Sequence, residues 1–318
     1  MNGPIAYLDG RWIAAGELCL SPNDAGFVLG VAVAEQLRTF RGELFHLEEH
    51  LDRLEHSLQI VGVAPPIDRR SLAEAAQRLA SANHALLDDG DDLGLGIVVT
   101  PGTYAAYAEG EVAGPTLLMH TYPLPFRLWA EKYDTGQAVV VTDVRQVPPE
   151  CWPPGLKCRS RMHYYLADRR AESIEPGARA ALVDAAGRLT EASTANLVIH
   201  RRSEGLVSPP LERILPGISL ARLGELARRL GIPMVYRDVM PSEAAEADEM
   251  LLASTPFCLL PVTRFQRRPV GRGLPGEVYR ALLAEWSREV GVDIAAQAKR
   301  FARRAGAREF RQRGRREP

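Results

Sequence analysis

The stretch ILPGISLARLGELARRLG, residues 214–231, decides the fold of the second half of the chain. Its Pro216–Gly217 pair is typical of a helix start and Gly231 of a helix end, so the sequence predicts one amphipathic helix here. Apolar segments with strand character flank this helix on both sides. They are AVVVTDV (138–144), ARAALVD (178–184), ANLVIH (195–200), MVYRDV (234–239), DEMLLAST (248–255) and LLPVTRF (259–265). Strands and helices mixed over this length predict an α/β or α+β domain.

The first part of the chain has a similar mixed character. YLDGRWI (7–13) predicts a hairpin with Asp9–Gly10 as its turn. In HLEEHLDRLEHSLQIVG (46–62) the leucines recur at intervals of three and four, which predicts a helix with one apolar face. A second helix is expected near 71–84, and strands are expected at 31–40, 94–100 and 115–120. We therefore expect an α+β block whose strands are mostly antiparallel.

A Pro-rich and aromatic segment, TYPLPFRLWAEKYDTGQ (121–137), separates the two blocks and indicates a crossing between domains. The expected organisation is a small N-terminal α/β domain at 1–122, a linker at 123–136, a larger domain at 137–298 and a basic tail at 299–318. The tail carries nine Lys or Arg residues against two Glu. It has no interleaved aromatic platform and no recognised motif, so we do not expect it to bind nucleic acid.

Composition excludes several classes of protein. The 318 residues are 46% hydrophobic and 25% charged, which is typical of a folded globular chain. No run of eighteen apolar residues occurs, and the first residues have no signal-peptide pattern, so we expect a cytoplasmic protein without a membrane segment. The four cysteines share no CxxC spacing, and His46 and His50 have no evident third ligand, so we expect no metal site.

Lysine is rare in this chain, and its distribution points to amine chemistry. Only three of the 39 basic residues are lysines: Lys132, Lys157 and Lys299. Arginine cannot form an imine, so a lysine needed for that chemistry could not be replaced. Lys157 lies in PPGLKCRSR with Arg159 and Arg161 nearby, a cationic setting that favours the neutral, nucleophilic amine. The same local sequence is also compatible with an ordinary surface lysine.

Further residues would suit a phosphorylated ring. Glu191, at a turn into a strand, is the kind of acid that could pair with a pyridine nitrogen held by Lys157. The N–H groups of Ile218 and Ser219 at the predicted helix start could bind an anion, although Ser219 could equally be a helix cap. Arg53 could add a charged partner, or instead pair with Glu49 one turn away. Thr255 offers a hydroxyl at a strand end.

In order along the chain, these segments resemble the class IV (fold-type IV) pyridoxal-phosphate (PLP) enzymes. The segments are NDAGFVLG (23–30), HLEEHLDRL (46–54), the isolated Lys157, TEASTANL (190–197), ILPGISL (214–220) and ASTPF (253–257). The resemblance covers about residues 5 to 290. The family includes branched-chain and D-amino-acid aminotransferases, (R)-selective amine transaminases and aminodeoxychorismate lyase. It implies a small α/β domain followed by a larger pseudo-barrel domain, and a homodimer.

The resemblance also implies roles for matching residues. Lys157 would form the Schiff base with PLP and carry the proton between substrate and cofactor. Glu191 would pair with the pyridine nitrogen, and Leu215 would pack on the ring. The phosphate would be bound by Arg53, Ile218, Ser219 and Thr255.

Substrate recognition departs from the family pattern. Where D-amino-acid enzymes carry an arginine in the segment corresponding to VVTPGTYAAY (98–107), this chain has Pro101. Arg38, on the strand at 31–40, is a candidate partner for a substrate carboxylate. Arg159 and Arg161 are further candidates, because they stand where family members often have other residues after the lysine.

The expected activity is transfer of an amino group between an amino acid or amine and a 2-keto acid, with ping-pong kinetics. A PLP-dependent lyase of the aminodeoxychorismate lyase type is an alternative. A serine hydrolase that uses Ser219 is another, because GISLA resembles the GxSxG pattern with Ala221 in place of the last glycine. A binding protein without catalysis on the same fold is a third.

Overall fold

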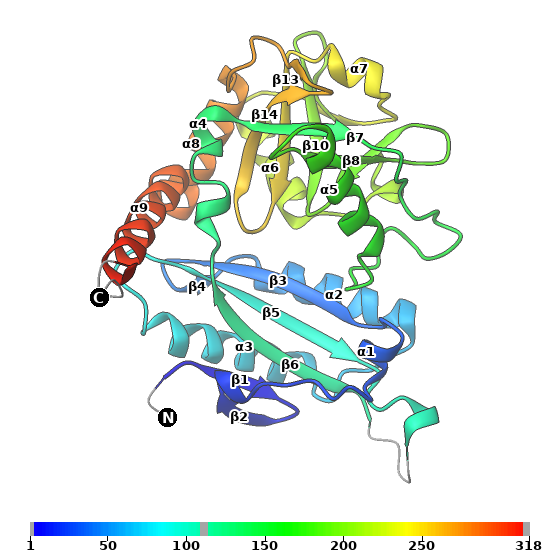
Figure 1. Cartoon of the computed structure of the whole chain (residues 1–318), viewed down its shortest axis with the longest axis vertical. Helices are drawn as coiled ribbons and strands as arrows, with labels where there is room; N and C mark the ends of the chain where they lie inside the picture. Colours follow the sequence, from blue (N-terminus) through cyan, green and yellow to red (C-terminus); the bar gives the residue numbers. More distant parts are fainter. Residues whose placement is uncertain (1–2, 109–113, 314–318) are drawn as a thin grey trace. The chain divides into compact units, whose positions relative to one another are not determined.

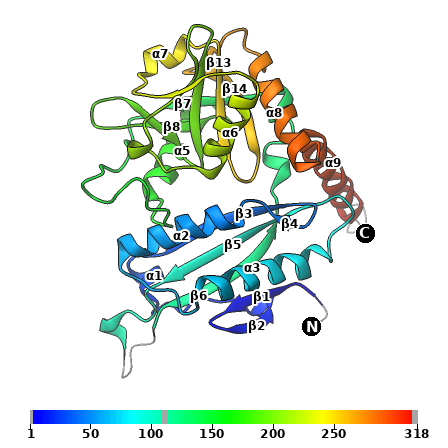
Figure 2. The same cartoon turned by 180° about the vertical axis from the view of Figure 1, so that it is seen from behind.

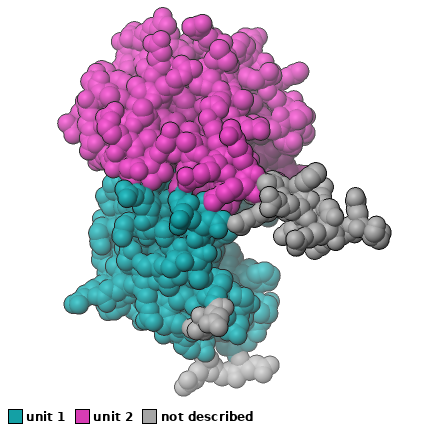
Figure 3. All heavy atoms as spheres, turned by 90° about the vertical axis from the view of Figure 1, so that its left-hand side faces the viewer, with its two compact units in different colours: residues 1–124, 149–162 teal, residues 125–148, 163–318 magenta. Residues whose placement is uncertain are grey.

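A computed structural model describes residues 3–108 and 114–313, with side chains described up to residue 304. The chain forms two compact units, which Figure 3 colours separately. Unit 1 contains residues 1–124 and 149–162, and unit 2 contains residues 125–148 and 163–318. The expected domain boundaries differ from this division. They place the segment 149–162 in the larger domain, whereas it belongs to unit 1. Backbone pairing explains the difference, since the amide of Ala34 donates to the carbonyl of Lys157 at 3.0 Å within unit 1.

Unit 1 is built on one six-stranded antiparallel sheet with strand order β2-β1-β6-β5-β3-β4 (Figure 1). The first hairpin is confirmed, because Leu8 pairs with Arg11 across Asp9–Gly10. The strands are β1 (Ile5–Leu8), β2 (Arg11–Ala14), β3 (Val33–Phe40), β4 (Glu43–Leu44), β5 (Leu93–Thr100) and β6 (Thr116–Pro123). The helices are η1 (Ala15–Glu17), α1 (Ala25–Val28), α2 (Leu47–Val61), α3 (Arg69–His84) and η2 (Ala105–Tyr107).

Helices α2 and α3 cover one face of this sheet, as Figure 2 shows. The leucines that recur at intervals of three and four, Leu51, Leu54 and Leu58, are buried against the sheet. On the sheet, residues of β3 and β5 such as Leu37 and Leu95 complete the core. Because side chains alternate along a strand, Glu35 shares this helix-covered face with Leu37.

Unit 2 contains the remaining elements. Its strands are β7 (Gln137–Val141), β8 (Arg179–Val183), β9 (Leu189–Ala192), β10 (Ala195–Arg201), β11 (Gly205–Ser208), β12 (Met234–Tyr236), β13 (Glu249–Ser254), β14 (Cys258–Phe265) and β15 (Arg268–Pro269). Its helices are η3 (Phe126–Leu128), α4 (Lys132–Thr135), α5 (Met162–Ile174), η4 (Leu211–Arg213), α6 (Ile218–Arg229), α7 (Pro241–Ala245), α8 (Glu277–Val290) and α9 (Ile294–Arg313).

The strands of unit 2 close into a barrel-like ring. They follow the order β12-β11-β10-β13-β14-β7-β8-β9, and β9 pairs again with β10, where Glu191 stands opposite Asn196. In the closed part, which runs from β10 through β13, β14, β7 and β8 to β9, the pairs β14–β7 and β7–β8 are parallel and the others are antiparallel. Outside it, β12 pairs in parallel with β11. This closure confirms the expected pseudo-barrel. The expected basic tail, residues 299–318, lies largely within a helix, since α9 extends to Arg313.

Candidate active site

Lys157 lies on a short extended segment that pairs with the chain leading into β3. The amide of Arg159 donates to the carbonyl of Ala32 at 2.8 Å, and the Lys157 carbonyl accepts from Ala34. The Lys157 amide donates to Ser57 Oγ on α2 at 3.1 Å. Backbone bonds on both sides therefore fix the lysine against β3 and α2.

The environment of Lys157 lowers the pKa of its amine to about 8. Burial is the largest cause, because a charged ammonium loses hydration there. The positive charges of Arg53, Arg161 and Arg159 act in the same direction, whereas the carboxylate of Glu35 opposes them. About a tenth of the amine is therefore neutral and nucleophilic at pH 7, far more than for an ordinary lysine, as the cationic sequence around it predicts.

We expect the amine of Lys157 to react with trinitrobenzenesulfonate at a rate that rises up to about pH 8 and then levels off. In a control lysine peptide the rate should continue to rise to about pH 10, since only the neutral amine reacts. Peptide mapping after brief labelling between pH 6 and 11 measures this. A profile for Lys157 that follows the control peptide would contradict the lowered pKa.

A buried ionic cluster lies beside Lys157 in unit 1. The carboxylate of Glu35 is fully buried and accepts from Arg53 Nε at 2.8 Å and Nη2 at 2.9 Å. His50 Nδ1 lies 2.7 Å from Glu35 Oε2. Burial would raise the pKa of Glu35, but Arg53 and His50 outweigh it and hold that pKa well below its usual range. Glu35 is therefore an anion that anchors both residues.

This cluster excludes one of the two sequence interpretations of Arg53, the pair with Glu49. Glu49, the partner considered one turn away, contacts His46 Nδ1 at 2.6 Å instead. Arg53 is held by Glu35, with 10% of its side chain exposed. His50, the other histidine of the pair, is fully buried, and its Nε2 has no hydrogen-bond partner among the described residues.

Glu191 in unit 2 accepts hydrogen bonds from side chains and from the backbone. Its Oε1 accepts from the Tyr164 hydroxyl at 2.7 Å and from Gln146 Nε2 at 3.0 Å. Its Oε2 accepts from the backbone amide of Leu215 at 3.3 Å. Asn196 Nδ2 in turn donates to the Leu215 carbonyl at 2.9 Å, which ties β10 to the segment before α6. The structure thus brings Glu191 and Leu215 together.

Helix α6 begins as the sequence predicts. Gly217 is its N-cap, and no side chain caps this end in the described part of the chain. A Cβ at Gly217 would collide with Asn196 Oδ1, so glycine is needed for this close approach. The amides of Ile218 and Ser219 therefore stand at an uncapped helix N-terminus, which favours anions. Thr255 directly follows β13, the strand that pairs with β10.

The three candidate arginines differ in their surroundings. Arg38 is fully buried, with its guanidinium 3.9 Å from the Phe40 ring centroid and its Nε donating to the Thr39 carbonyl at 3.2 Å. Arg159 is exposed and Arg161 is half-buried, and both lower the pKa of Lys157. Arg159 and Arg161 are therefore the more accessible cations near the lysine.

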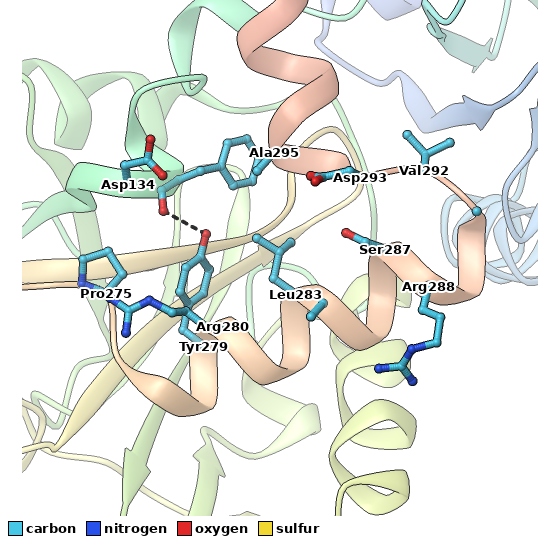
Figure 4. A pocket seen from close by; sticks show the side chains of 13 residues that line it. Asp134, Pro275, Tyr279, Arg280, Leu283, Ser287, Arg288, Val292, Asp293 and Ala295 are labelled. Atoms are coloured by element: carbon cyan, nitrogen blue, oxygen red, sulfur yellow. Dashed lines mark hydrogen bonds between the residues drawn. The ribbon is translucent and has the colours of Figure 1, made fainter.

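A hollow of about 870 Å³ in unit 2 lies between α4, α8 and the turn into α9 (Figure 4). Tyr279 crosses it and donates from its hydroxyl to the Tyr133 carbonyl at 3.2 Å. None of the residues expected to bind cofactor or substrate lines this hollow.

The described residues contain neither a candidate metal site nor a helix able to span a membrane. They contain no group of three or more His, Cys, Asp or Glu that could hold a metal ion. Within the same residues, no helix is long and apolar enough to cross a membrane.

Comparison with known proteins identifies the family. The family described as "Amino-transferase class IV" matches residues 32–265. The chain belongs to this family. A D-alanine aminotransferase of Bacillus licheniformis is 25% identical to this class IV aminotransferase over 269 residues, which cover 84% of this chain and 90% of that protein.

Solved structures show the same fold. A branched-chain aminotransferase from Thermoproteus uzoniensis, crystallised with norvaline, aligns with a TM-score of 0.79 at 22% identity, over 91% of this chain and 96% of that one. A T.th. branched-chain amino acid aminotransferase, complexed with N-(5'-phosphopyridoxyl)-L-glutamate, aligns with a TM-score of 0.80 at 19% identity, over 92% and 95%. The chain thus has the fold-type IV architecture that its sequence indicates.

Family membership resolves the alternatives for activity. The chain is an aminotransferase, and neither the lyase nor the serine hydrolase is favoured by these relatives. The Ser219 hydroxyl has no hydrogen bond to a histidine within the described residues.

Sequence reasoning missed three residues of these two clusters. Glu35 had a signal, because it lies between the apolar residues Val33 and Leu37 on the core face of one strand, where a carboxylate needs a partner. Gln146 and Tyr164 had no such signal, because each is far from Glu191 along the chain.

Proposed function

We propose that this class IV aminotransferase uses PLP, attached at Lys157, to move an amino group from an amino acid to a 2-keto acid. Family membership supports the cofactor, because class IV aminotransferases are PLP-dependent. The sequence resemblance supports the individual roles: Glu191 faces the pyridine nitrogen, Leu215 packs on the ring, and Arg53, Ile218, Ser219 and Thr255 bind the phosphate.

The described residues fit such a cofactor chemically. Lys157 offers an amine whose pKa is lowered to about 8, and Glu191 offers a carboxylate fixed on both oxygens. The uncapped N-terminus of α6 offers donors for a dianionic phosphate, beside the buried Ser219. The buried Nε2 of His50 has an unmet hydrogen bond in the cluster that holds Arg53.

Each residue would contribute one function to the reaction. Bound PLP supplies an aldehyde that condenses with amines and a ring that withdraws electrons from the substrate α-carbon. Lys157 would hold the cofactor, and its Nζ, when free, would be the base for the proton on the substrate α-carbon. The same Nζ would carry that proton back, which needs an amine with a pKa near the working pH. Glu191 would accept a hydrogen bond from the ring nitrogen and keep that nitrogen protonated.

The observation that carries this proposal is the placement of Lys157, whose backbone is bonded to Ser57 and Ala34 in surroundings that lower the pKa of its amine to about 8. Borohydride reduction of the PLP-loaded enzyme, followed by peptide mapping, tests it. We expect a reduced phosphopyridoxyl group on Lys157. Labelling of Lys132 or Lys299 in its place, or of no lysine, would overturn the proposal.

Arg159 is the residue that we propose for binding the substrate carboxylate, with Arg161 and Arg38 as the other candidates. Among the described residues, no carboxylate forms an ion pair with Arg159. We expect Arg159→Ala to raise KM for the keto acid about tenfold, because one charge-assisted hydrogen bond to the substrate is lost. The change in kcat should be smaller. Steady-state kinetics measure this, with Arg70→Ala, whose arginine pairs with Glu74 on the surface of α3, as the control. An unchanged KM would assign the carboxylate to another residue.

We also propose that the enzyme is a homodimer in the cytoplasm, as the sequence resemblance implies. Light scattering on the purified protein should give twice the chain mass of 35.0 kDa.

A further inference from the structure

Tyr164 and Gln146 form a closed hydrogen-bonded group with Glu191. The Tyr164 hydroxyl lies 2.7 Å from Glu191 Oε1, Gln146 Nε2 lies 3.0 Å from the same oxygen, and Nε2 lies 3.1 Å from the hydroxyl. A hydroxyl that donates to a carboxylate at this distance forms a charge-assisted bond, which is stronger than one between neutral groups. Two donors on one oxygen restrict rotation of the carboxylate.

Both donors are fixed by the barrel. Tyr164 packs against the apolar core of α5, β7 and β8, which includes Ala167 and Leu182. The Gln146 amide donates to the Val183 carbonyl at 3.0 Å, which anchors the loop after β7 to β8. The hydroxyl and the side-chain amide therefore have little freedom to move away from Glu191.

Gln146 has an unmet hydrogen bond in this arrangement. Its Oε1 is buried without a partner among the described residues, while its Nε2 donates to two oxygens. A buried acceptor without a partner is costly, and such groups occur where another requirement decides the orientation. Here the requirement is a donor toward Glu191.

We infer that Tyr164 and Gln146 are positioning residues that hold Glu191 for its hydrogen bond with the pyridine nitrogen. This inference rests on the proposed function, because it assumes that Glu191 faces the cofactor ring. With Oε1 held by Tyr164 and Gln146, and Oε2 near the Leu215 amide, the orientation of the carboxylate is fixed by groups of the protein itself. A fixed acceptor loses less entropy on binding than a mobile one.

The test compares PLP with its 1-deaza analogue, in which CH replaces the ring nitrogen. Dissociation constants are measured by titrating the full-length apoenzyme with each compound. We expect the unsubstituted enzyme to prefer PLP. Tyr164→Phe should weaken PLP binding about tenfold, because one charge-assisted hydrogen bond to Glu191 is lost. The dissociation constant of the analogue should stay within about twofold of its value for the unsubstituted enzyme.

The neighbouring residue provides a matched control. Tyr165 follows Tyr164 on α5, and 62% of it is exposed, so Tyr165→Phe should leave both dissociation constants unchanged. Gln146→Leu removes the second donor at similar volume and should again weaken binding of PLP more than of the analogue. Thermal unfolding of each apoenzyme shows whether the variants remain folded.

The outcomes separate this inference from the function on which it rests. Equal weakening of PLP and its analogue by Tyr164→Phe would show a general structural role and overturn the inference. Equal affinity of the unsubstituted enzyme for both compounds would also overturn it, while borohydride labelling at Lys157 would leave the proposed function intact. If the unsubstituted enzyme binds no PLP, the proposed function fails, and this inference fails with it.

Discussion

Lys157→Ala is expected to leave a folded protein whose transamination rate is lower by about 10,000-fold, the upper range for loss of a positioned general base. The same side chain would attach the cofactor, so no other lysine should substitute for it. Stability should not suffer, because burial already disfavours the charged amine at this position. Single-turnover assays of amino transfer measure the rate, and circular dichroism confirms the fold.

Lys132→Ala provides the control for this loss. Lys132 begins α4 in unit 2, and it is one of only three lysines in the chain. Its replacement should leave the rate within about twofold, because the half-buried Lys132 belongs to neither of the side-chain clusters around Lys157 and Glu191. A Lys157→Ala enzyme that retained a tenth of the activity would contradict the mechanism proposed for this side chain.

Glu35→Gln is expected to lower the free energy of unfolding by about 3 kcal/mol, because it leaves the largely buried Arg53 without its counter-ion. It should also lower the pKa of Lys157 below about 8, since the Glu35 carboxylate raises that pKa. Urea denaturation at pH 7 measures the first effect, and trinitrobenzenesulfonate labelling of Lys157 measures the second. An unchanged labelling profile would show that Glu35 has no influence on the lysine.

The pH dependence gives an independent check on Glu35. Its pKa is lowered in the folded protein from an ordinary value of 4.5. The stability that it contributes is therefore complete above about pH 4.5 and is lost as the pH falls through the folded-state pKa. Unsubstituted protein should lose stability more steeply in acid than Glu35→Gln. Glu74→Gln on the surface of α3 removes the exposed partner of Arg70 and should leave the acid dependence of stability as it is in the unsubstituted protein.

Local patterns predicted the elements of this fold well. The Pro216–Gly217 pair predicted the start of α6, and the leucine spacing predicted α2. Each of these signals is contained within a few neighbouring residues of its own helix. Closure of the barrel depends on pairings such as β14 with β7, whose residues are more than 120 positions apart. No local pattern encodes such a pairing, so the expected pseudo-barrel came from the resemblance to a family.

The candidate site was predictable to a similar degree. Scarcity of lysine and the neighbouring arginines indicated Lys157, and the lowered pKa agrees with that reasoning. The two side-chain donors to Glu191 come from a loop and a helix 45 and 27 residues away, so only the folded chain shows them. The roles of Arg53, Glu191, Leu215, Ile218, Ser219 and Thr255 toward a cofactor stay predictions.

The return of residues 149–162 to unit 1 limits how this enzyme can be recombined with its relatives. A chimaera joined after residue 124 would take Lys157 from one parent, but Ala34 and Ser57, which bond its backbone, from the other. Mismatched parents would then misplace the amine even if both halves folded. Exchange of segments 1–124 and 149–162 together needs three junctions instead of one. It would keep all the residues that form these bonds from the same parent.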